Sequence, residues 1–216
     1  MRDSMLQKNK HAAGNAVQFV LRALRYHLIG LKLKRAARNS PLRIAIGAGD
    51  ECAAGWIATD KEHIDVVYPA SMSRYFKKDA IDAILAEHVW EHLTDTDAWL
   101  AAQTCRYFLK PGGYMRIAVP DGFFPDSRYI EQVRPGGSGP GAEDHRVLYN
   151  YRTLQDLFGS LGYEVRLLEY WDEAGVFHAA PWEAKDGLIR RSKKYDPRNH
   201  EGGLGYTSLI LDAIKR

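Results

Sequence analysis

The stretch from Pro41 to Asp60 constrains the fold of this chain more than any other part of the sequence. One short apolar run, Leu42 to Ile46, ends abruptly in Gly47-Ala48-Gly49, and a second run, Trp56 to Thr59, ends in Asp60. Glycines after a strand let the backbone approach a ligand closely, and a carboxylate after the next strand can accept hydrogen bonds from ribose hydroxyls. The pattern favours an α/β sheet that holds an adenosine-bearing ligand, although a simple tight turn would also produce it.

The following residues extend the alternation of strands and helices. Short apolar runs predict strands at Ile64–Val67, Ala80–Leu85 and Tyr114–Val119, and Thr94 begins a capping-box-like start for a helix through Leu109. This alternation predicts a parallel sheet with right-handed crossovers, in which the ligand crevice lies at the carboxyl ends of the strands. The residues at those ends are Gly47 to Asp50, Asp60, Tyr68 to Ala70, Ala86 to His88, and Pro120-Asp121.

The order of these motifs resembles the class I S-adenosylmethionine-dependent methyltransferases. The most specific parts are His-Val-Trp-Glu-His-Leu after the run at 80–85 and Lys-Pro-Gly-Gly before the run at 114–119. More narrowly, the chain looks like a bacterial subgroup of predicted methyltransferases with a short Gly-x-Gly…Gly-Trp-Ile…Asp front end. The likeness extends from about Leu42 to the C-terminus. It implies a Rossmann-like, doubly wound, mostly parallel seven-stranded sheet with an antiparallel last strand, and S-adenosylmethionine as the cofactor.

The resemblance also implies a set of cofactor-binding residues. Gly47, Ala48 and Gly49 would pass beneath the methionine portion of the cofactor, and Asp60 would bind the ribose hydroxyls. Glu87 and His88 would lie near the sulfonium and the incoming acceptor, so that His88 is a candidate for both cofactor binding and catalysis.

Two features depart from the family pattern. Only ten residues separate Gly49 from Asp60, which is too few for the full helix that usually joins the first two strands. The acidic residue that many relatives carry after the third strand is replaced by Tyr68-Pro69. Both departures bear on cofactor affinity more than on the fold.

The pentapeptide His88-Val89-Trp90-Glu91-His92 also matches His-x-x-Glu-His, the inverted zinc-peptidase signature. That chemistry needs both histidines on one face of a continuous helix, with the glutamate activating water. An apolar strand runs into His88, and a new helix cap follows at Thr94, which leaves little room for such a helix. We therefore favour the methyltransferase interpretation, keep a zinc hydrolase through His88, Glu91 and His92 as a lesser alternative, and expect no metal.

A long connection rich in glycine and proline follows, from Asp121 to Gly141. A loop of this length beside the end of a strand favours a substrate lid, with disorder as the alternative. His145 comes next, before a helix expected over Tyr151–Leu161 with Asn150 as its cap. An imidazole titrates near working pH, so His145 is the candidate base for removing a proton from the acceptor, although it could equally brace the loop.

Two further strands are expected at Tyr163–Tyr170 and Tyr206–Ile214. The insertion between them, residues 176–205, is much longer than a hairpin turn requires and holds aromatic residues and the basic run Arg190-Arg191-Ser192-Lys193-Lys194. Beside the crevice, these groups would suit an anionic or glycan-like acceptor. A solvated loop is the alternative.

The charge is concentrated in the N-terminal segment. Residues 1–49 contain ten Lys or Arg and a single acid, so this segment carries +9 and the remainder −6 of the formal total of +3. Apolar residues recur here at helical spacing and predict a basic amphipathic helix: Val17, Val20, Leu21, Leu24, Leu28 and Leu31. We expect a helical extension over residues 1–40 that contacts an anionic membrane surface or a protein partner, or that packs on the domain. Nucleic acid is disfavoured, because aromatic residues are not interleaved with the basic ones.

Composition adds little beyond these motifs. Two cysteines, Cys52 and Cys105, give neither a disulfide framework nor zinc-cluster spacing, and the N-terminus lacks a signal-peptide pattern, so we expect a cytoplasmic protein. Residues 41–216 would form one S-adenosylmethionine-binding methyltransferase domain acting on a small-molecule or glycan-like acceptor. The alternatives are a non-catalytic member of the same fold that binds the cofactor or a partner, and an NAD-dependent oxidoreductase, which the incomplete glycine motif disfavours.

Overall fold

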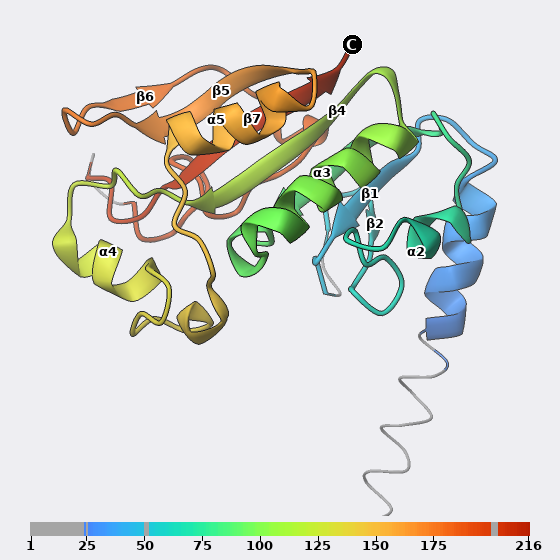
Figure 1. Cartoon of the computed structure of the whole chain (residues 1–216), viewed down its shortest axis with the longest axis horizontal. Coiled ribbons are helices and arrows are strands. Elements are labelled where there is room, and N and C mark those ends of the chain that lie inside the picture. Colours follow the sequence, from blue (N-terminus) through green and yellow to red (C-terminus); the bar gives the residue numbers. More distant parts are fainter. Residues whose placement is uncertain (1–23, 25, 50–51, 200–202) are drawn as a thin grey trace, which may run out of the picture.

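A seven-stranded sheet with the order β2-β1-β3-β4-β7-β5-β6 forms the centre of the molecule (Figure 1). The computed structural model describes residues 24, 26–49, 52–199 and 203–216. Strands β2, β1, β3 and β4 are parallel, whereas β7 is antiparallel to both β4 and β5. The predicted Rossmann-like α/β fold with an antiparallel last strand is therefore confirmed. The strands are β1 (Arg43–Ile46), β2 (Ile57–Ala58), β3 (Ile81–Glu87), β4 (Leu109–Pro120), β5 (Tyr163–Trp171), β6 (Phe177–Ala179) and β7 (Ser208–Lys215).

The strand expected at Ile64–Val67 does not form, and this prediction was wrong. The side chain of Asp65 accepts a hydrogen bond from Val67 N at 3.1 Å, and its carbonyl accepts hydrogen bonds from Tyr68 N and Ser71 Oγ. An Asp that captures a nearby N–H offers the backbone a turn in place of a sheet ladder. The seventh strand is instead β6, at the opposite edge of the sheet, where it pairs with β5.

The two long helices begin where side chains cap them. Thr94 accepts a hydrogen bond from Asp97 N at the start of α3 (Asp95–Phe108). Asn150 accepts from two backbone N–H groups at the start of α5 (Tyr151–Ser160), where Thr153 completes a capping box. These caps satisfy the N–H groups that a helix start leaves unpaired. Besides a helix over residues 26–36, the other helical elements of the described residues are α2 (Pro69–Ser73), α4 (Ser127–Val133) and the 3₁₀ turns η1 (Trp90–His92), η2 (Ala142–Asp144) and η3 (Ala184–Asp186).

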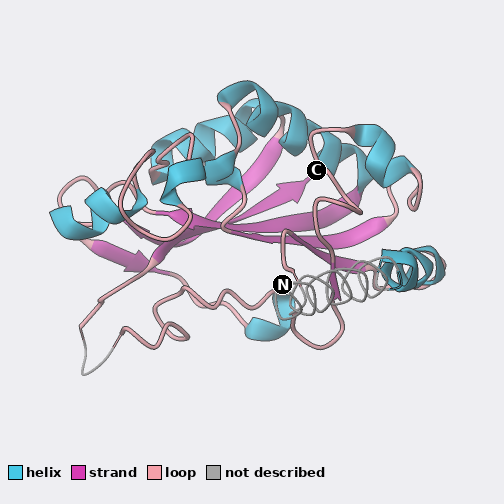
Figure 2. Cartoon of the chain, turned by 90° about the horizontal axis from the view of Figure 1, so that it is seen from below, coloured by secondary structure: helices cyan, strands magenta, loops and turns pink. Residues whose placement is uncertain are grey.

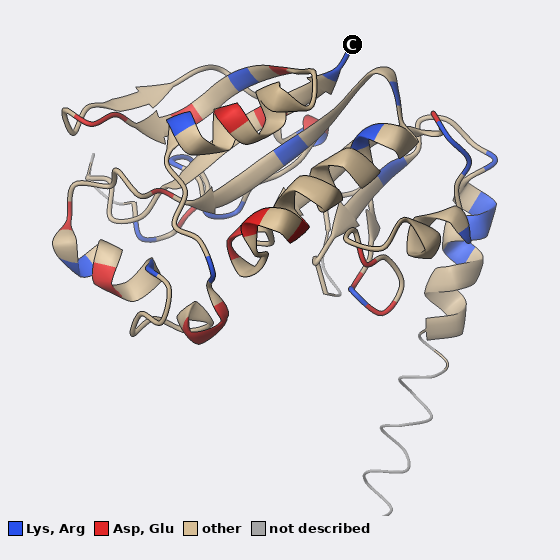
Figure 3. Ribbon diagram, in the orientation of Figure 1, with Lys and Arg blue, Asp and Glu red and all other residues tan. Residues whose placement is uncertain are grey.

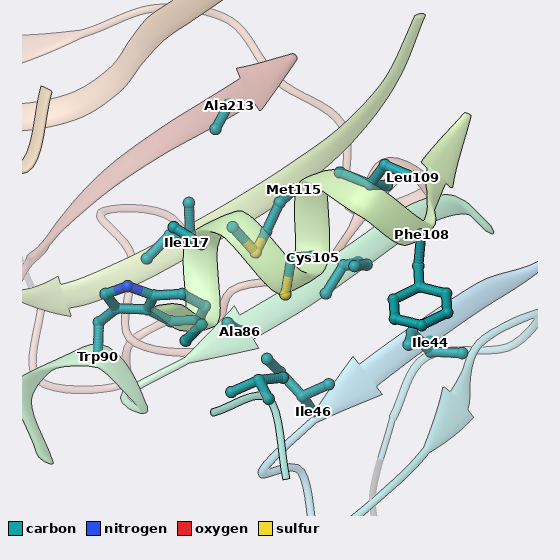
Figure 4. Close-up of a cluster of buried hydrophobic side chains, with 14 of the residues drawn as sticks. Ile44, Ile46, Ala86, Trp90, Cys105, Phe108, Leu109, Met115, Ile117 and Ala213 are labelled. Carbon is teal, nitrogen blue, oxygen red and sulfur yellow. The ribbon is translucent and has the colours of Figure 1, made fainter. Parts of the chain in front are cut away.

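Helices α3 and α5 cover one face of the sheet and enclose the larger core. Figure 4 shows Trp90, Cys105 and Phe108 lying above β1, β3 and β4, and all three are at most 1% exposed. Trp90 also packs against Phe158 of α5, with ring centroids 5.7 Å apart. Burial raises the pKa of the Cys105 thiol to about 12, so this cysteine is an inert core residue.

The opposite face of the sheet is covered by the insertion rather than by helices (Figure 2). Ile189, which is fully buried, packs with Trp56 and Leu85 in a second core cluster. Arg116 on β4 fixes the insertion, because its Nη1 donates to the carbonyl of Gly187 at 3.0 Å and to that of Glu183 at 3.2 Å. The insertion thus packs on the face of the sheet that holds Trp56 and Leu85. The basic residues Arg190, Arg191, Lys193 and Lys194 are exposed, so both alternatives for this run, an acceptor-binding segment and a solvated loop, stay predictions.

A helix over residues 26–36 packs beside the loop that follows β2. Tyr26 stacks on His63 with ring centroids 4.5 Å apart, and Leu33 is fully buried in the larger core. Leu24, Leu28 and Leu31 are exposed instead, so they do not pack on the domain. The rest of the predicted stripe, Val17, Val20 and Leu21, lies outside the described residues. Within the described part of the chain, we find no helix with the length and apolarity needed to span a bilayer.

Candidate functional site

Three pockets meet at Gly47, at the carboxyl end of β1. We name them by one lining residue each: the Cys52 pocket of about 200 Å³, the Asp60 pocket of about 250 Å³ and the His145 pocket of about 500 Å³. Gly47 has a φ of 61°, and a Cβ at this position would lie 2.7 Å from Cγ2 of Val89. Position 47, where the three pockets meet, therefore accepts only glycine, because a side chain would displace Val89 in the wall of the Asp60 pocket.

The Asp60 pocket is an apolar slot with carboxylates at its rim. Asp60 follows β2 and is exposed, and its Oδ1 accepts a hydrogen bond from Lys61 N at 2.6 Å. Asp65 also lines the pocket. This position could not be predicted, because residues 64–67 have the hydrophobic pattern of a strand. The remaining lining is mostly aliphatic: Ile46, Ile64, Val66, Val67, Val89 and Leu93. Apolar walls with a few polar groups suit a flat ring system attached to a sugar.

The Cys52 pocket lies between the Gly47-Ala48 turn and the insertion. Arg190 and Arg191 line it together with Glu87 of β3, whose Oε1 accepts a hydrogen bond from Arg191 N at 2.8 Å. Two guanidinium groups beside a glycine turn favour a carboxylate-bearing ligand. Sequence analysis identified the basic run but could not assign it to this turn, since more than 140 residues separate the two segments.

His88 is held in a constrained conformation between β3 and η1. Its φ is 55°, its Nε2 lies 3.0 Å from Ser208 Oγ, and its Nδ1 lies 2.8 Å from Glu91 Oε1. A left-handed φ costs a non-glycine residue free energy and is typical of functional sites. Because Nε2 is hydrogen-bonded to Ser208 and Nδ1 lies beside the Glu91 carboxylate, His88 suits a positioning role better than that of a free base. The continuous helix that a zinc-peptidase signature requires is replaced here by the three-residue turn η1.

The His145 pocket joins two sets of side chains. One wall holds Glu91, His92 and His145, and the other holds Arg191, Arg198 and Tyr206. The ring of His145 is 9% exposed, and its Nδ1 lies 2.7 Å from the carbonyl oxygen of Val133. A carbonyl oxygen can only accept, so Nδ1 donates to it, and in the neutral form of the ring the lone pair is on Nε2. The candidate base thus has a nitrogen ready to take a proton.

Arg198 in the His145 pocket is paired with a buried carboxylate. Asp196 binds Arg198 through two hydrogen bonds of 2.8 Å and 2.6 Å, and the bond to Asp196 raises the pKa of the Arg198 guanidinium. That guanidinium lies 3.6 Å from the centre of the Tyr206 ring, a cation–π contact. Burial raises the pKa of the Tyr206 hydroxyl, so this tyrosine remains a neutral donor. Arg191 and the Tyr206 hydroxyl, which line the same pocket, suit an anionic or hydroxyl-rich group.

The segment from Asp121 to Gly141 is folded, which contradicts the alternative of disorder. The carboxylate of Asp121 accepts hydrogen bonds from Phe123 N at 3.0 Å and from Trp171 N at 2.8 Å. Burial raises its pKa to about 6, and the two backbone bonds offset part of that shift. Tyr129 of α4 stacks on Phe124 with ring centroids 4.1 Å apart. Asp121 therefore fastens this segment to β5, and the role of a lid over the acceptor stays a prediction.

The fold gathers nearly all of the predicted site residues at one end of the sheet. Gly47, Ala48 and Glu87 line the Cys52 pocket, Asp60 and His88 line the Asp60 pocket, and His88 and His145 line the His145 pocket. Gly49, whose φ is 58°, shapes the turn but is not among the lining residues of these pockets. Asp65 and Arg198 line these pockets but were not among the predicted site residues, and Arg191 was identified only as part of the basic run. The long separation along the chain hides the arginines from any local pattern.

Comparison with known proteins gives one family. The family described as "methyltransferase domain" matches residues 20–168, well over half of the 216 residues. No curated protein matches the chain.

Among solved structures, a SAM-dependent methyltransferase from Archaeoglobus fulgidus is 15% identical, with 88% of this chain and 94% of that chain covered and a TM-score of 0.48. An S-adenosylmethionine-dependent methyltransferase from Mesorhizobium loti is 11% identical, with 82% of each chain covered and a TM-score of 0.49.

Proposed function

Because the chain belongs to the methyltransferase-domain family, we propose that it transfers a methyl group from S-adenosylmethionine to a small-molecule or glycan-like acceptor. Membership of this family confirms the class of fold and the cofactor predicted from the sequence. The narrower bacterial subgroup stays a prediction. The observation that carries the proposal is the meeting of three pockets of different chemistry at Gly47.

The residues around Gly47, where the three pockets meet, fit the parts of the cofactor. The apolar slot beside Asp60 and Asp65 suits an adenosine, with carboxylates to accept hydrogen bonds from the ribose and the base. The Cys52 pocket, with Arg190 and Arg191, suits the carboxylate of the methionine portion. Gly47 leaves room between the two, because a Cβ there would meet Val89.

The third pocket is assigned to the acceptor. S-adenosylmethionine supplies an electrophilic methyl group on a sulfonium, which a lone pair of the acceptor attacks in line with the departing sulfur. The chain contributes mainly by positioning: Arg191 and Arg198 orient the acceptor, and His145 Nε2 takes the proton if the nucleophile is a hydroxyl. His88 holds Glu91 and the end of β7 in place.

A non-catalytic member of the fold is the second candidate. Its strongest support in the sequence is the missing acid after a third strand, but Asp65 lines the Asp60 pocket from the segment where that strand was expected. An acidic residue is therefore present beside the proposed adenosine. The enzyme is favoured accordingly, and a partner-binding role for the fold stays the alternative.

Calorimetric titration with S-adenosylmethionine and S-adenosylhomocysteine tests the proposal. We expect both to bind the wild-type chain, and Asp60→Ala to weaken binding by about tenfold or more through loss of charge-assisted hydrogen bonds to the ribose. Asp156→Ala, which removes an exposed carboxylate on α5 far from the pockets, is the matched control and should bind as wild type does. A wild-type chain that binds neither compound would refute the proposal.

Proton transfer needs a separate assay. Methyl transfer from labelled S-adenosylmethionine to a panel of hydroxyl-bearing small molecules and glycans should fall by about 100-fold or more in His145→Gln, within the range typical of general-base loss. Binding of S-adenosylhomocysteine should be unchanged in that variant. Equal turnover in the variant and the wild type would remove His145 from the reaction.

A further inference from the structure

Three potential metal ligands converge at one wall of the His145 pocket. One ligand atom from each of Glu91, His92 and His145 lies within 4.8 Å of the others. Glu91 and His92 belong to η1, whereas His145 follows η2 in a distant part of the sequence. The backbone fixes these two segments together, because Arg146 N donates to the Glu91 carbonyl at 2.7 Å and Val147 N donates to it at 3.2 Å. The cluster is therefore built into the fold rather than formed by mobile surface side chains.

Glu91 provides an independent sign of a missing partner. Its side chain is 1% exposed, and neither carboxylate oxygen accepts a hydrogen bond of normal geometry, although His88 Nδ1 lies 2.8 Å from Oε1. A buried carboxylate is costly unless hydrogen bonds, a cation or a metal ion compensate it. A single imidazole beside one oxygen leaves the second oxygen without compensation. A bound cation would supply it.

The histidines have the arrangement that metal sites use. His145 donates through Nδ1 to the Val133 carbonyl at 2.7 Å, which orients the ring and leaves Nε2 as a ligand atom. The ring of His92 meets it edge-on, with centroids 4.8 Å apart. Two imidazoles and one carboxylate are the donor set of catalytic zinc sites and of 2-His-1-carboxylate sites, which both keep positions open for substrate.

We infer that Glu91, His92 and His145 bind a divalent transition-metal cation, such as Zn²⁺ or Mn²⁺, in the acceptor pocket. This set differs from the one that the His-x-x-Glu-His pattern suggests, since His88 is replaced by His145. It also departs from the sequence-based expectation of no metal. A cation here would bind an oxygen of the acceptor while Arg191 and Arg198 hold a neighbouring anionic group.

The choice of acceptor rests on the proposed function. Coordination lowers the pKa of a bound hydroxyl, so an acceptor hydroxyl would lose its proton to water and attack as the alkoxide or phenolate. His145 would then act as a ligand and not as the base. The inference therefore narrows the acceptor to a molecule with a coordinating hydroxyl next to an anionic group, such as a 2-hydroxy acid.

Metal binding by the full, tag-free chain tests the site without any turnover. Equilibrium dialysis against Zn²⁺ or Mn²⁺ should give one bound ion per chain, and Co²⁺ should give a visible absorption spectrum of nitrogen and oxygen ligation. Glu91→Gln and His145→Gln should each weaken binding by about 100-fold or more, because each removes a direct ligand. His178→Gln is the matched control, since it removes an imidazole that pairs with Asp172 outside the cluster.

Binding of S-adenosylhomocysteine, measured on the same samples, separates the outcomes. Variants that retain this binding are folded, so their loss of metal reports on the ligands. Failure of the wild-type chain to bind any of the three ions would overturn the inference, as would equal losses in His178→Gln and Glu91→Gln. Metal binding without binding of the adenosyl compounds would support the metal site and refute the proposed function.

A second inference concerns the helix over residues 26–36 and rests on different observations. Leu24, Leu28 and Leu31, three or four residues apart on one face of this helix, are all more than half exposed. Lys32 and Lys34 lie on the flanks of this face, and Arg35 and Arg38 extend it toward the domain. Figure 3 shows the turns of this helix that lack charged residues in tan and its basic end, beside the domain, in blue.

We propose that this face binds the surface of an anionic lipid bilayer. Leucines on one face with cations at its edges are typical of helices that lie in the interface and are attracted by anionic headgroups. The net charge of +9 on residues 1–49 has the matching sign.

Sedimentation with phosphatidylcholine vesicles, with and without phosphatidylglycerol, tests this second inference. We expect binding only to the anionic vesicles, weakened by salt, and lowered by about tenfold or more in Leu28→Ser/Leu31→Ser. Leu100→Ser, at an exposed leucine of α3, is the control. Equal binding to both kinds of vesicle, no binding, or a dimer in solution that the double variant abolishes would overturn it.

Discussion

Replacing Gly47 by alanine tests the crossing point of the three pockets most sharply. The new Cβ would lie 2.7 Å from Cγ2 of Val89, and the backbone would keep a φ of 61° that L-residues rarely adopt. The left-handed conformation costs about 1–2 kcal/mol, and overpacking typically costs about 1–3 kcal/mol more. The free energy of unfolding should therefore fall by about 2–5 kcal/mol.

Gly49→Ala is a matched control that measures the cost of the left-handed backbone conformation without a side-chain clash. Its φ is 58°, nearly that of Gly47, but nothing lies within 4 Å of the position where its Cβ would be. This variant should lose only about 1–2 kcal/mol.

Urea denaturation gives both free energies, and calorimetry gives the affinity for S-adenosylhomocysteine. Because Val89 lines the Asp60 pocket and must shift to relieve the clash, Gly47→Ala should weaken binding by about tenfold or more, whereas Gly49→Ala should change it little. Equal losses of stability and affinity in the two variants would refute the reasoning, since the clash with Val89 would then have no measurable effect.

Three further predictions concern the supports of the site. Asn150→Ala removes the cap of α5 and should lower the free energy of unfolding by about 1 kcal/mol in urea denaturation; no change would mean that water replaces the cap. Arg116→Met leaves Asp212 without its buried partner and removes the hydrogen bonds to the carbonyls of the insertion. The free energy of unfolding should fall by about 3 kcal/mol, and residues 180–199 should become accessible to limited proteolysis. Unchanged cleavage would contradict this expectation. Burial raises the pKa of Asp121 to about 6 in the folded chain, so the folded state binds the proton of this carboxyl group more tightly than the unfolded state does. The contribution of Asp121 to the free energy of unfolding therefore falls as the pH rises from about 4 to 6. That contribution is about 3 kcal/mol at most, and Asp121→Asn should flatten the pH dependence of urea midpoints; an identical profile in the variant would refute the assignment.

Local patterns predicted much of the fold. The caps at Thr94 and Asn150 and the strands at β1, β3, β4, β5 and β7 depend on neighbouring residues, so the sequence alone carries them. The strand expected at Ile64–Val67 failed because one side chain, Asp65, competes with the ladder for a backbone N–H. A hydrophobic pattern alone does not detect that competition.

The insertion and the N-terminal helix show a second reason why local patterns do not predict the whole structure. Arg116 binds the Gly187 carbonyl across 71 positions of the sequence, and no local pattern reveals such a contact. The helix presents Leu33 to the core and Leu28 to solvent, although both are leucines. Periodicity identifies which residues share a face, but only the packing of the other elements decides which face is buried.

The places of the site residues that follow strands could be predicted from the sequence, whereas the places of the other site residues could not. Gly47, Asp60 and Glu87 gather at one end of the sheet, as the rule for parallel strands predicts. His145 joins them from a loop, and Arg191 and Arg198 join from the insertion, so their places depend on tertiary structure. The roles of all these residues in binding and catalysis stay predictions.

The central claim is that the cofactor lies across Gly47 with its adenosine in the Asp60 pocket. A crystal structure of the chain with S-adenosylhomocysteine tests it most directly. We predict ribose hydroxyls within hydrogen-bond distance of the Asp60 carboxylate, the adenine beside Val66 and Val67, and the amino-acid end toward Arg191. An adenosine bound in either of the other two pockets, or a ribose out of reach of Asp60, would contradict the account.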